Sequence, residues 1–269
     1  MSGPTQPEPT VQQLFDLRGR VALVTGGTGH LGTALSRALA EAGASVVITS
    51  REAARAAAAA AALPIVESAR HHGVQLDHMD PISLADGFAA ALAAAGQIDI
   101  LVNNGHEALA NDWKTVTFEQ FQRHMGNAAG YFELSRRVRD HAASRGAAAS
   151  IILLGSMYGQ VASYADAYEG VCQASPVAYH ALKGGVIHMT RHLAAYWAAD
   201  GVRVNCLSPG PFPSDKAPAA MVERLKTKLP MKRMGRASEL KGAIVFLASD
   251  ASSFMTGQNL TIDGGWTAW

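Results

Sequence analysis

Tyr179 and Lys183 stand four residues apart, a spacing that places both side chains on one face of a helix. A free phenol titrates at about pH 10, and a neighbouring ammonium group lowers that pKa toward neutrality. Such a tyrosine can pass a proton to or from a carbonyl or alcohol oxygen. The same spacing also arises by chance on solvated helices, so a catalytic role depends on partners elsewhere in the chain.

The composition favours a cytoplasmic protein that binds a small molecule. The chain has 269 residues, 48% of them hydrophobic, which suits one well-buried α/β domain. A net charge of +1 and 17% charged residues give no broad electrostatic reason to expect nucleic acid or a membrane surface as partner. No apolar run approaches the roughly 18 residues that span a bilayer. Cys172 and Cys206 lack metal-ligand spacing and fit a reducing compartment, so no metal site is expected.

We expect a single catalytic domain over residues 14–269. Short β-branched runs alternate with alanine-rich segments, a pattern that predicts parallel strands joined by crossover helices. The expected strands cover residues 21–25, 45–49, 74–76, 98–103, 150–154, 202–207 and 259–262. Such strands predict a Rossmann-type, doubly wound α/β sheet with helices on both faces. Residues 1–13 have no signal-peptide pattern and are expected to be a disordered tail.

A glycine-rich loop follows the first expected strand, and a segment with helical periodicity follows the loop at residues 33–42. This order lets backbone N–H groups and the N-terminus of the helix meet a pyrophosphate. The loop therefore predicts a dinucleotide site, whose expected binding residues are Gly26, Thr28, Gly29, His30, Leu31 and Gly32.

Ser50 and Arg51 follow the second strand, where the adenosine ribose of a dinucleotide would lie. NAD sites commonly place a carboxylate there, whereas a guanidinium pairs with the 2′-phosphate of NADP. We therefore expect NADP(H) as the preferred cofactor, with NAD(H) as the alternative. Another interpretation, which the adjacent Glu52 keeps open, is that Arg51 is a solvated residue that opens the next helix.

From about residue 17 to the C-terminus the chain resembles the short-chain dehydrogenase/reductase family. The family's glycine motif matches the loop after the first strand, except that His30 replaces the middle glycine, a loss of flexibility that Gly29 is expected to offset. The family's Asn-Asn-Ala-Gly segment corresponds to residues 103–106, with His106 at the last glycine position. Each imidazole is expected either to contact the cofactor or to point to solvent, and neither is a catalytic candidate.

The resemblance identifies four catalytic residues in the family's order, namely Asn127, Ser156, Tyr179 and Lys183. It implies that Ser156 hydrogen-bonds the substrate oxygen and that Tyr179 transfers the proton. Lys183 would lower the pKa of that tyrosine and hold the nicotinamide ribose, and Asn127 would anchor a water that relays protons to the lysine.

The resemblance also implies cofactor contacts after the later strands. The expected residues are Asp77 and His78 near the adenine, Asn103 and Gly105 after the fourth strand, Tyr179 and Lys183 at the nicotinamide end, and Pro209, Gly210, Phe212 and Ser214 in a Pro-Gly loop after the sixth. Ser214 stands at a threonine position of the family and keeps its hydroxyl group.

Two variable segments bear on the substrate. Ser156 and Tyr179 are 179 − 156 = 23 residues apart, more than the family commonly shows, so residues 163–176 are expected to form a loop that lines or overhangs the substrate site. Its Asp166, Glu169 and Gln173 suit the hydroxyl groups of a sugar or polyol, although a loop for subunit contacts is the alternative. Residues 215–236, at the family's lid position, are rich in lysine and arginine, which suits either an anionic substrate or a merely solvated lid.

Together these features predict an NADP(H)-dependent oxidoreductase that acts on a carbonyl or secondary alcohol of a small hydroxylated substrate, such as a sugar or polyol. The resemblance implies a homotetramer. Two alternatives stay open. One is a 3-oxoacyl-thioester reductase of the same family, and the other is a dinucleotide-binding sensor without turnover, which the two glycine-to-histidine changes would suit.

Overall fold

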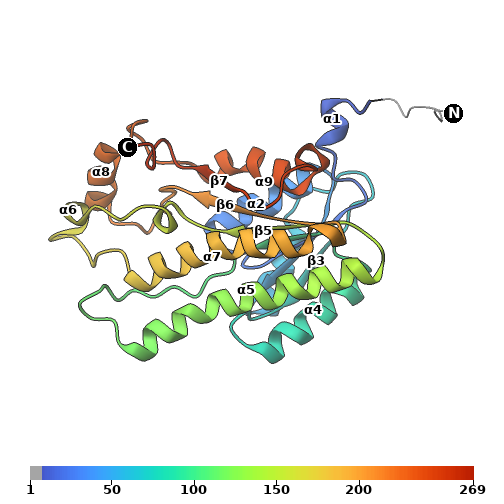
Figure 1. The fold of residues 1–269 in the computed structure, drawn as a ribbon, viewed down its shortest axis with the longest axis horizontal. Coiled ribbons are helices and arrows are strands. Elements are labelled where there is room, and N and C mark those ends of the chain that lie inside the picture. Colours follow the sequence, from blue (N-terminus) through green and yellow to red (C-terminus); the bar gives the residue numbers. More distant parts are fainter. Residues whose placement is uncertain (1–7) are drawn as a thin grey trace.

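The computed structural model describes residues 8–269 and contains one seven-stranded, all-parallel sheet (Figure 1). The strand order is β3-β2-β1-β4-β5-β6-β7. The strands are β1 Val21–Val24, β2 Ser45–Ser50, β3 His71–Gln75, β4 Ile100–Asn103, β5 Ala149–Leu154, β6 Val202–Pro209 and β7 Asn259–Ile262. The predicted single-domain Rossmann-type fold is therefore confirmed.

The largest difference from the expected strands is at β3, which begins at His71 rather than at residue 74. Its first three residues are half-buried and pair with residues 46–48 of β2. They form no apolar run, because β3 is an edge strand of the sheet and is not enclosed as the central strands are. A search for continuous apolar runs therefore finds only the end of this strand.

Helices cover both faces of the sheet. They are α1 Val11–Leu14, α2 His30–Glu41, α3 Ala53–Ala61, α4 Pro81–Ala95, α5 Phe118–Ser144, α6 Ala165–Tyr168, α7 Val177–Trp197, α8 Ala219–Lys228 and α9 Lys241–Ala248. On one face α4, α5 and α7 enclose an apolar core, and on the other α2, α3 and α9 enclose a second one. Within residues 8–269 no helix is both long and apolar enough to cross a bilayer.

Part of the N-terminal stretch expected to be disordered is helical. Residues 1–7 lie outside the described residues, but Val11–Leu14 form the short helix α1, which begins inside the stretch 1–13. Thr10 Oγ1 accepts a hydrogen bond from Gln13 N at 3.3 Å, and Gln13 Oε1 accepts one from Thr10 N at 2.7 Å. This reciprocal cap satisfies two backbone N–H donors that a helix start otherwise leaves unpaired.

The strand order creates a crevice at the centre of the sheet. From β1 the chain moves outward through β2 to β3 and then returns to β4 on the other side of β1. The loops that leave β1 and β4 therefore diverge at the carboxyl ends of these strands, which is where open α/β sheets bind ligands. Since all the strands are parallel, every strand contributes its C-terminal loop to this same edge.

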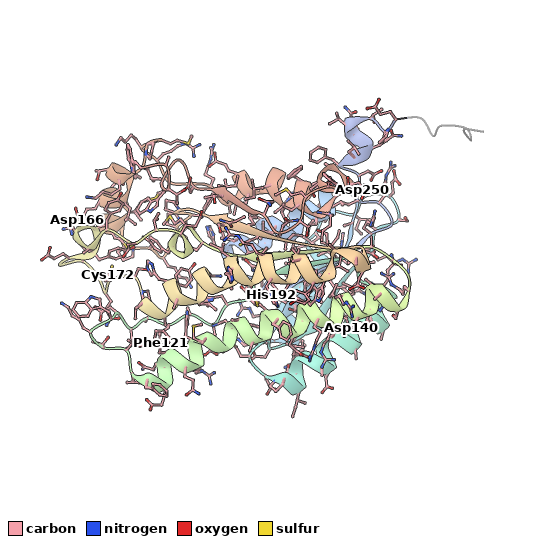
Figure 2. All side chains as sticks on the ribbon, in the orientation of Figure 1. Phe121, Asp140, Asp166, Cys172, His192 and Asp250 are labelled. Carbon is pink, nitrogen blue, oxygen red and sulfur yellow. The ribbon has the colours of Figure 1, made fainter. Side chains whose placement is uncertain are left out.

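One end of the molecule gathers the segments that can surround this edge. In Figure 1, α6, α8 and the C-terminus lie together at the end where α5 and α7 begin. Figure 2 places Phe121, in the first turns of α5, at the same end as Asp166 and Cys172, whereas Asp140 and Asp250 lie at the other. The variable loop and the lid thus cluster at the end where the C-terminal edge of the sheet opens.

Candidate active site

A cavity of about 510 Å³ runs along the C-terminal edge of the sheet. It is lined by residues from the loops after β1 through β6, and so it brings together segments from residue 26 to residue 212. Of the predicted cofactor-binding residues, all except Asn103 and Ser214 line it. Three of the four predicted catalytic residues, Ser156, Tyr179 and Lys183, line it as well.

The glycine loop forms the part of the cavity below the N-terminus of α2. Gly26 has φ +60°, and a Cβ on Gly32 would lie 2.2 Å from the carbonyl oxygen of Gly26, so both positions require glycine. Gly29 is extended, with φ −85° and ψ 172°, which any residue adopts, so it does not supply the expected flexibility. His30 fits because it is the exposed first residue of the helix.

The N-terminus of α2 suits an anionic group. Its N-cap residue, Gly29, has no side chain that could accept hydrogen bonds from the first N–H groups of the helix. These groups border the cavity, together with the positive end of the helix dipole. A pyrophosphate therefore fits at this helix N-terminus, as the glycine-rich loop predicts.

Arginines flank the far end of the cavity, beyond β2. Arg51, before α3, and Arg55, in its first turn, both line it with Ser50 and Glu52. Glu52 pairs with Arg55 at 3.3 Å, while none of the ion pairs in residues 8–269 includes Arg51. The Arg51 guanidinium is therefore available for a ligand, whereas Arg55, which the sequence patterns did not identify, already has a carboxylate partner.

Asn103 faces away from the cavity. Its buried side chain donates hydrogen bonds to the Tyr131 carbonyl at 3.1 Å and to Ser135 Oγ at 3.0 Å, which fastens β4 to α5. The next residue, Asn104, lines the cavity instead and donates to the carbonyl oxygens of Thr25 and Gly26. Side chains alternate along an extended segment, so neighbouring asparagines serve the core and the cavity in turn.

Lys183 and Tyr179 sit at the catalytic end of the cavity, on α7. Lys183 is 3% exposed, its Nζ donates to the Leu154 carbonyl at 2.6 Å, and burial lowers its pKa to about 8. Burial raises the pKa of Tyr179, and a hydrogen bond with Ser156 only partly opposes this. The Lys183 ammonium lies 5.6 Å from the Tyr179 ring centroid. The expected lowering of the tyrosine pKa by the lysine is therefore not what this structure shows.

Asn127 braces the segment after β4 rather than lining the cavity. Its Oδ1 accepts hydrogen bonds from Glu107 N at 2.8 Å and from His78 Nε2 at 2.9 Å. Its Nδ2 donates to the carbonyl oxygens of His124 at 2.8 Å and Glu107 at 3.2 Å. Because these four bonds occupy the amide, a relay water at this residue would have to bind its backbone.

Comparison with known proteins relates the chain to dehydrogenases over nearly its whole length. The family model described as enoyl-(acyl carrier protein) reductase matches residues 28–267. The chain is 37% identical to galactitol 2-dehydrogenase (L-tagatose-forming) of Cereibacter sphaeroides, over 95% of this chain and 98% of that protein. The chain belongs to the short-chain dehydrogenase/reductase family. It is an oxidoreductase of this family that acts on CH–OH groups.

Solved structures of family members share the fold. A short-chain type dehydrogenase/reductase from Mycobacterium marinum superimposes with a TM-score of 0.86 at 31% identity, covering 97% of this chain and 100% of that one. A gluconate 5-dehydrogenase from Burkholderia cenocepacia J2315, in complex with NADP and tartrate, gives a TM-score of 0.85 at 32% identity, with 97% and 100% coverage.

In this dehydrogenase the loop 163–176 holds the lid and does not line the cavity. Asp166 Oδ2 pairs with Lys228 Nζ of α8 at 2.5 Å, and Arg224 donates to the carbonyl oxygens of Asp166 and Glu169. An apolar cluster joins the two segments, made of Met157, Ala167, Tyr168, Leu225, Leu229 and Trp266. The loop therefore does not line this cavity, because Asp166 uses its carboxylate to hold the lid, whereas the expectation that the loop overhangs the substrate stays a prediction.

Most lysines and arginines of the lid, residues 215–236, also have partners within the protein. Besides the two cations above, Lys226 pairs with Glu223 at 2.6 Å, and Arg233 pairs with Glu239 at 2.7 Å. A cation with a carboxylate partner has little charge left to attract an anionic substrate. The solvated-lid interpretation therefore fits this dehydrogenase better than the anionic-substrate one.

The cavity of the dehydrogenase also contains residues that the sequence patterns did not select, namely Glu52, Arg55, Leu76, Asn104, His106, Glu107, Leu154 and Gly155. Some carried a signal, since Asn104 adjoins a selected asparagine and His106 departs from the family pattern. Glu107 carried none. It lines the cavity, and a fork of two hydrogen bonds from Arg123 holds its carboxylate and lowers its pKa.

Proposed function

We propose that this protein is an NADP(H)-dependent oxidoreductase that transfers hydride between the nicotinamide and a secondary alcohol or carbonyl of a small polyol or sugar. The observation that carries the proposal is the convergence of Ser156, Tyr179 and Lys183 on one end of a cavity whose other end has the glycine loop and Arg51. Relatives that act on galactitol and gluconate support the hydroxylated substrate class.

The cavity fits a dinucleotide along its length. The uncapped N-terminus of α2 suits the pyrophosphate, and Arg51 suits a 2′-phosphate on the adenosine ribose. Lys183 makes one hydrogen bond and has two further N–H donors for the nicotinamide ribose. When bound, the cofactor supplies or accepts the hydride. The Burkholderia relative was solved with NADP, which supports this choice, and NAD(H) is the alternative.

Ser156 and Tyr179 are arranged to handle the substrate oxygen. Ser156 Oγ accepts a hydrogen bond from Tyr158 N at 3.1 Å, and it also hydrogen-bonds Tyr179, so both hydroxyl groups face the place of a substrate oxygen. Because burial raises the pKa of Tyr179, this phenol is protonated at neutral pH and can donate to a carbonyl that is being reduced. Oxidation of an alcohol needs the reverse transfer, in which the deprotonated Tyr179 accepts the proton.

The decisive experiment measures turnover of a panel of polyols, sugar acids and 3-oxoacyl thioesters with NADP(H) and NAD(H). We expect polyols or sugars to react with NADP+, and Tyr179→Phe to lower kcat/KM by about 10² to 10⁴. Faster turnover of the thioesters would favour the acyl-reductase alternative. Tight cofactor binding without turnover on any substrate would indicate a sensor.

We also propose a cytoplasmic homotetramer. Phe118 and Phe132 on α5, and Val177 and Tyr196 on α7, are exposed apolar side chains on two helices that lie side by side (Figure 1). Paired copies of this surface would remove them from water. Light scattering after size exclusion tests the assembly: a monomer at micromolar concentration would contradict it.

A further inference from the structure

His106 occupies a glycine position of the family, and its imidazole packs against the catalytic tyrosine. The ring centroids of His106 and Tyr179 are 5.3 Å apart, with the ring planes at 80°. His106 lines the cavity together with Tyr179 and Ser156. A side chain in contact with the proton-transferring phenol is close to the substrate atoms that flank the reacting carbon.

His124, on α5, lies behind this imidazole. Its ring centroid is 5.0 Å from that of His106, with the planes at 86°, and 6.3 Å from that of Tyr179. Only 3% of the His124 surface is exposed, so the helix holds it in place. The two histidines, here called the imidazole pair, therefore form a fixed polar wall beside the catalytic tyrosine.

The imidazole pair has unused hydrogen-bonding groups. Nδ1 of His106 and Nε2 of His124 are buried and have no hydrogen-bond partner in residues 8–269, so the nitrogen of the pair that a ligand in the cavity can reach is Nε2 of His106. Buried polar atoms in folded proteins are almost always paired, because leaving one unpaired destabilises the fold. If packing against Tyr179 were the whole role of His106, a phenylalanine would provide it without this penalty.

Both rings are held in the neutral form. Burial lowers the pKa of His106 to about 3, and the charge of Lys183 acts in the same direction. Burial and then Lys183 also lower the pKa of His124. A neutral imidazole has one N–H donor and one acceptor, which matches a hydroxyl group that also donates and accepts. A carboxylate or phosphate has acceptors only and matches it less well.

A metal ion is a poorer match than a hydroxyl group. No cluster of three metal-ligating side chains occurs within the part of the chain that the structure describes. The remaining nearby imidazole, that of His78, is committed elsewhere, because its Nε2 donates to Asn127 Oδ1. Asn127 Oδ1 is the acceptor there, since its Nδ2 already donates to two carbonyl oxygens.

We infer that His106, supported by His124, hydrogen-bonds the hydroxyl group on the carbon next to the reacting carbon. The enzyme thereby selects substrates with two neighbouring hydroxyl groups, or a hydroxyl next to a carbonyl, over simple secondary alcohols and ketones. This inference rests on the proposed function and makes His106 the specificity-determining residue within it.

The test compares two replacements of His106. H106F keeps a ring against Tyr179 but removes both nitrogens, whereas H106Q removes the ring and keeps a donor and an acceptor. Each variant is assayed on polyols that the wild type oxidises, and on deoxy analogues that lack the neighbouring hydroxyl. We expect the ratio of kcat/KM for polyol to that for deoxy analogue to fall about 10- to 100-fold in H106F and much less in H106Q.

His188→Phe is the matched control, because it changes an exposed histidine on α7 that does not line the cavity, and it should keep the wild-type ratio. A retained ratio in H106F with a loss in H106Q would assign His106 to packing and overturn the inference. An unchanged ratio with weaker NADPH binding, measured by fluorescence titration, would assign His106 to the cofactor and overturn it as well. A wild type that oxidises no polyol would instead refute the proposed function, and the inference with it.

Discussion

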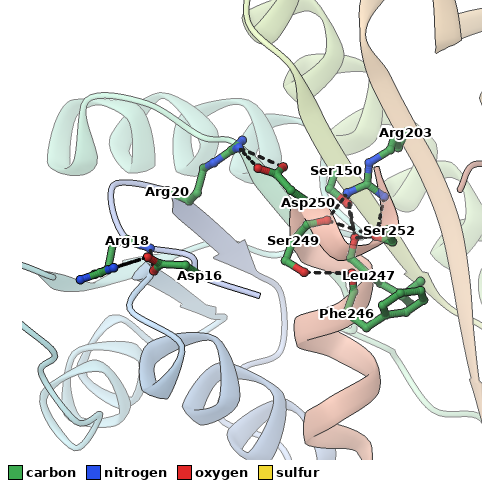
Figure 3. Close-up of polar contacts among 10 residues, drawn as sticks. All are labelled: Asp16, Arg18, Arg20, Ser150, Arg203, Phe246, Leu247, Ser249, Asp250 and Ser252. Atoms are coloured by element: carbon green, nitrogen blue, oxygen red, sulfur yellow. Dashed lines mark hydrogen bonds and ion pairs between the residues drawn. The ribbon is translucent and has the colours of Figure 1, made fainter. Parts of the chain in front are cut away.

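Two cations inside the fold, Arg203 and Lys183, are handled in opposite ways. Arg203, near the start of β6, donates hydrogen bonds to the carbonyl oxygens of Leu247 and Ser249 at 3.1 Å and to Ser252 Oγ at 2.9 Å (Figure 3). These acceptors surround the C-terminal end of α9, where the helix dipole is negative. Burial lowers the pKa of Arg203, and the charge of Asp250 opposes this. Arg203 thus has the partners that a structural cation needs.

Lys183, at the opposite edge of the sheet, has far fewer partners. It donates one hydrogen bond, to Leu154 O, and no ion pair within residues 8–269 includes it. Burial without a counter-ion lowers its pKa to about 8. The structural cation, Arg203, thus has hydrogen-bond partners within the fold, whereas the catalytic cation, Lys183, has few. The free donors and charge of Lys183 can serve a ligand, but their burial lowers the stability of the fold.

Lys183→Met should break this comparison most strongly. We expect kcat/KM to fall by about 10² to 10⁴, because the ribose contact and the charge beside Tyr179 are both lost. We expect the free energy of unfolding at pH 7 to rise by about 1 to 3 kcal/mol, because the charged lysine is disfavoured by burial. Denaturant unfolding at pH 7 and pH 10 measures this free energy of unfolding for the wild type and the variant. The lysine is destabilising below its folded pKa of about 8, so the gain should shrink as the pH rises toward 10.5.

Arg203→Met should have the opposite signature. The carbonyl oxygens that Arg203 now satisfies would be left without donors at the end of α9. We expect the free energy of unfolding to fall by about 2 to 4 kcal/mol. Since Arg203 does not line the cavity, the folded variant should keep its turnover number. A variant of normal stability but low activity would show that the two cations are not divided between structure and catalysis.

Arg51→Asp extends the comparison to a third cation, one that lines the cavity and lacks an ion pair. We expect the preference for NADPH over NADH, as a ratio of kcat/KM values, to fall by about 10- to 100-fold. The new carboxylate would repel a 2′-phosphate and accept a ribose hydroxyl. Arg70→Asp, an exposed charge reversal away from the cavity, is the control. Equal changes of the NADPH/NADH ratio in the two variants would mean that Arg51 acts only through its long-range charge and does not contact the 2′-phosphate.

The sequence was sufficient for the fold because the central strands are apolar on both faces and leave a continuous signal. Val21–Val24 and Ala149–Leu154 are fully buried, and both were found within a residue or so of their ends. The edge strand β3 carries histidines and a glycine, so its start was missed. Helix α1 was missed because its reciprocal cap, and not apolar burial, supports it.

The site divides in the same way. The family resemblance selected Asn127, Ser156, Tyr179 and Lys183, and the last three line one cavity whereas Asn127 does not. Which of two adjacent asparagines faces the cavity depends on strand register, which motif matching does not resolve. The pKa of Tyr179 and the pairing of Asp166 with the lid depend on burial and on contacts distant in sequence. Such properties exist only in the folded chain.

The smallest expected effect is the pH dependence that His106, beside Tyr179, gives to the free energy of unfolding. The folded-state pKa of His106 is about 3, below its usual value of 6.5 in an unfolded chain. Below pH 6.5 the unfolded state therefore binds a proton that the folded state refuses. The stability that the neutral imidazole confers is thus complete above pH 6.5 and is lost as the pH falls toward 3. Burial is the main cause of this low pKa, the charge of Lys183 adds to it, and protonation of His124 or His78 at low pH would act in the same direction.

His106→Gln should remove this contribution. Between pH 6.5 and pH 5 the free energy of unfolding of the wild type should fall more steeply than that of the variant, by up to about 1.4 kcal/mol per pH unit. Urea unfolding at half-unit pH steps measures both slopes, with His188→Gln as an exposed control. Identical slopes would mean that His106 is protonated in the folded protein. A protonated ring would carry two donors and no acceptor, and the match to a substrate hydroxyl would then have to be abandoned.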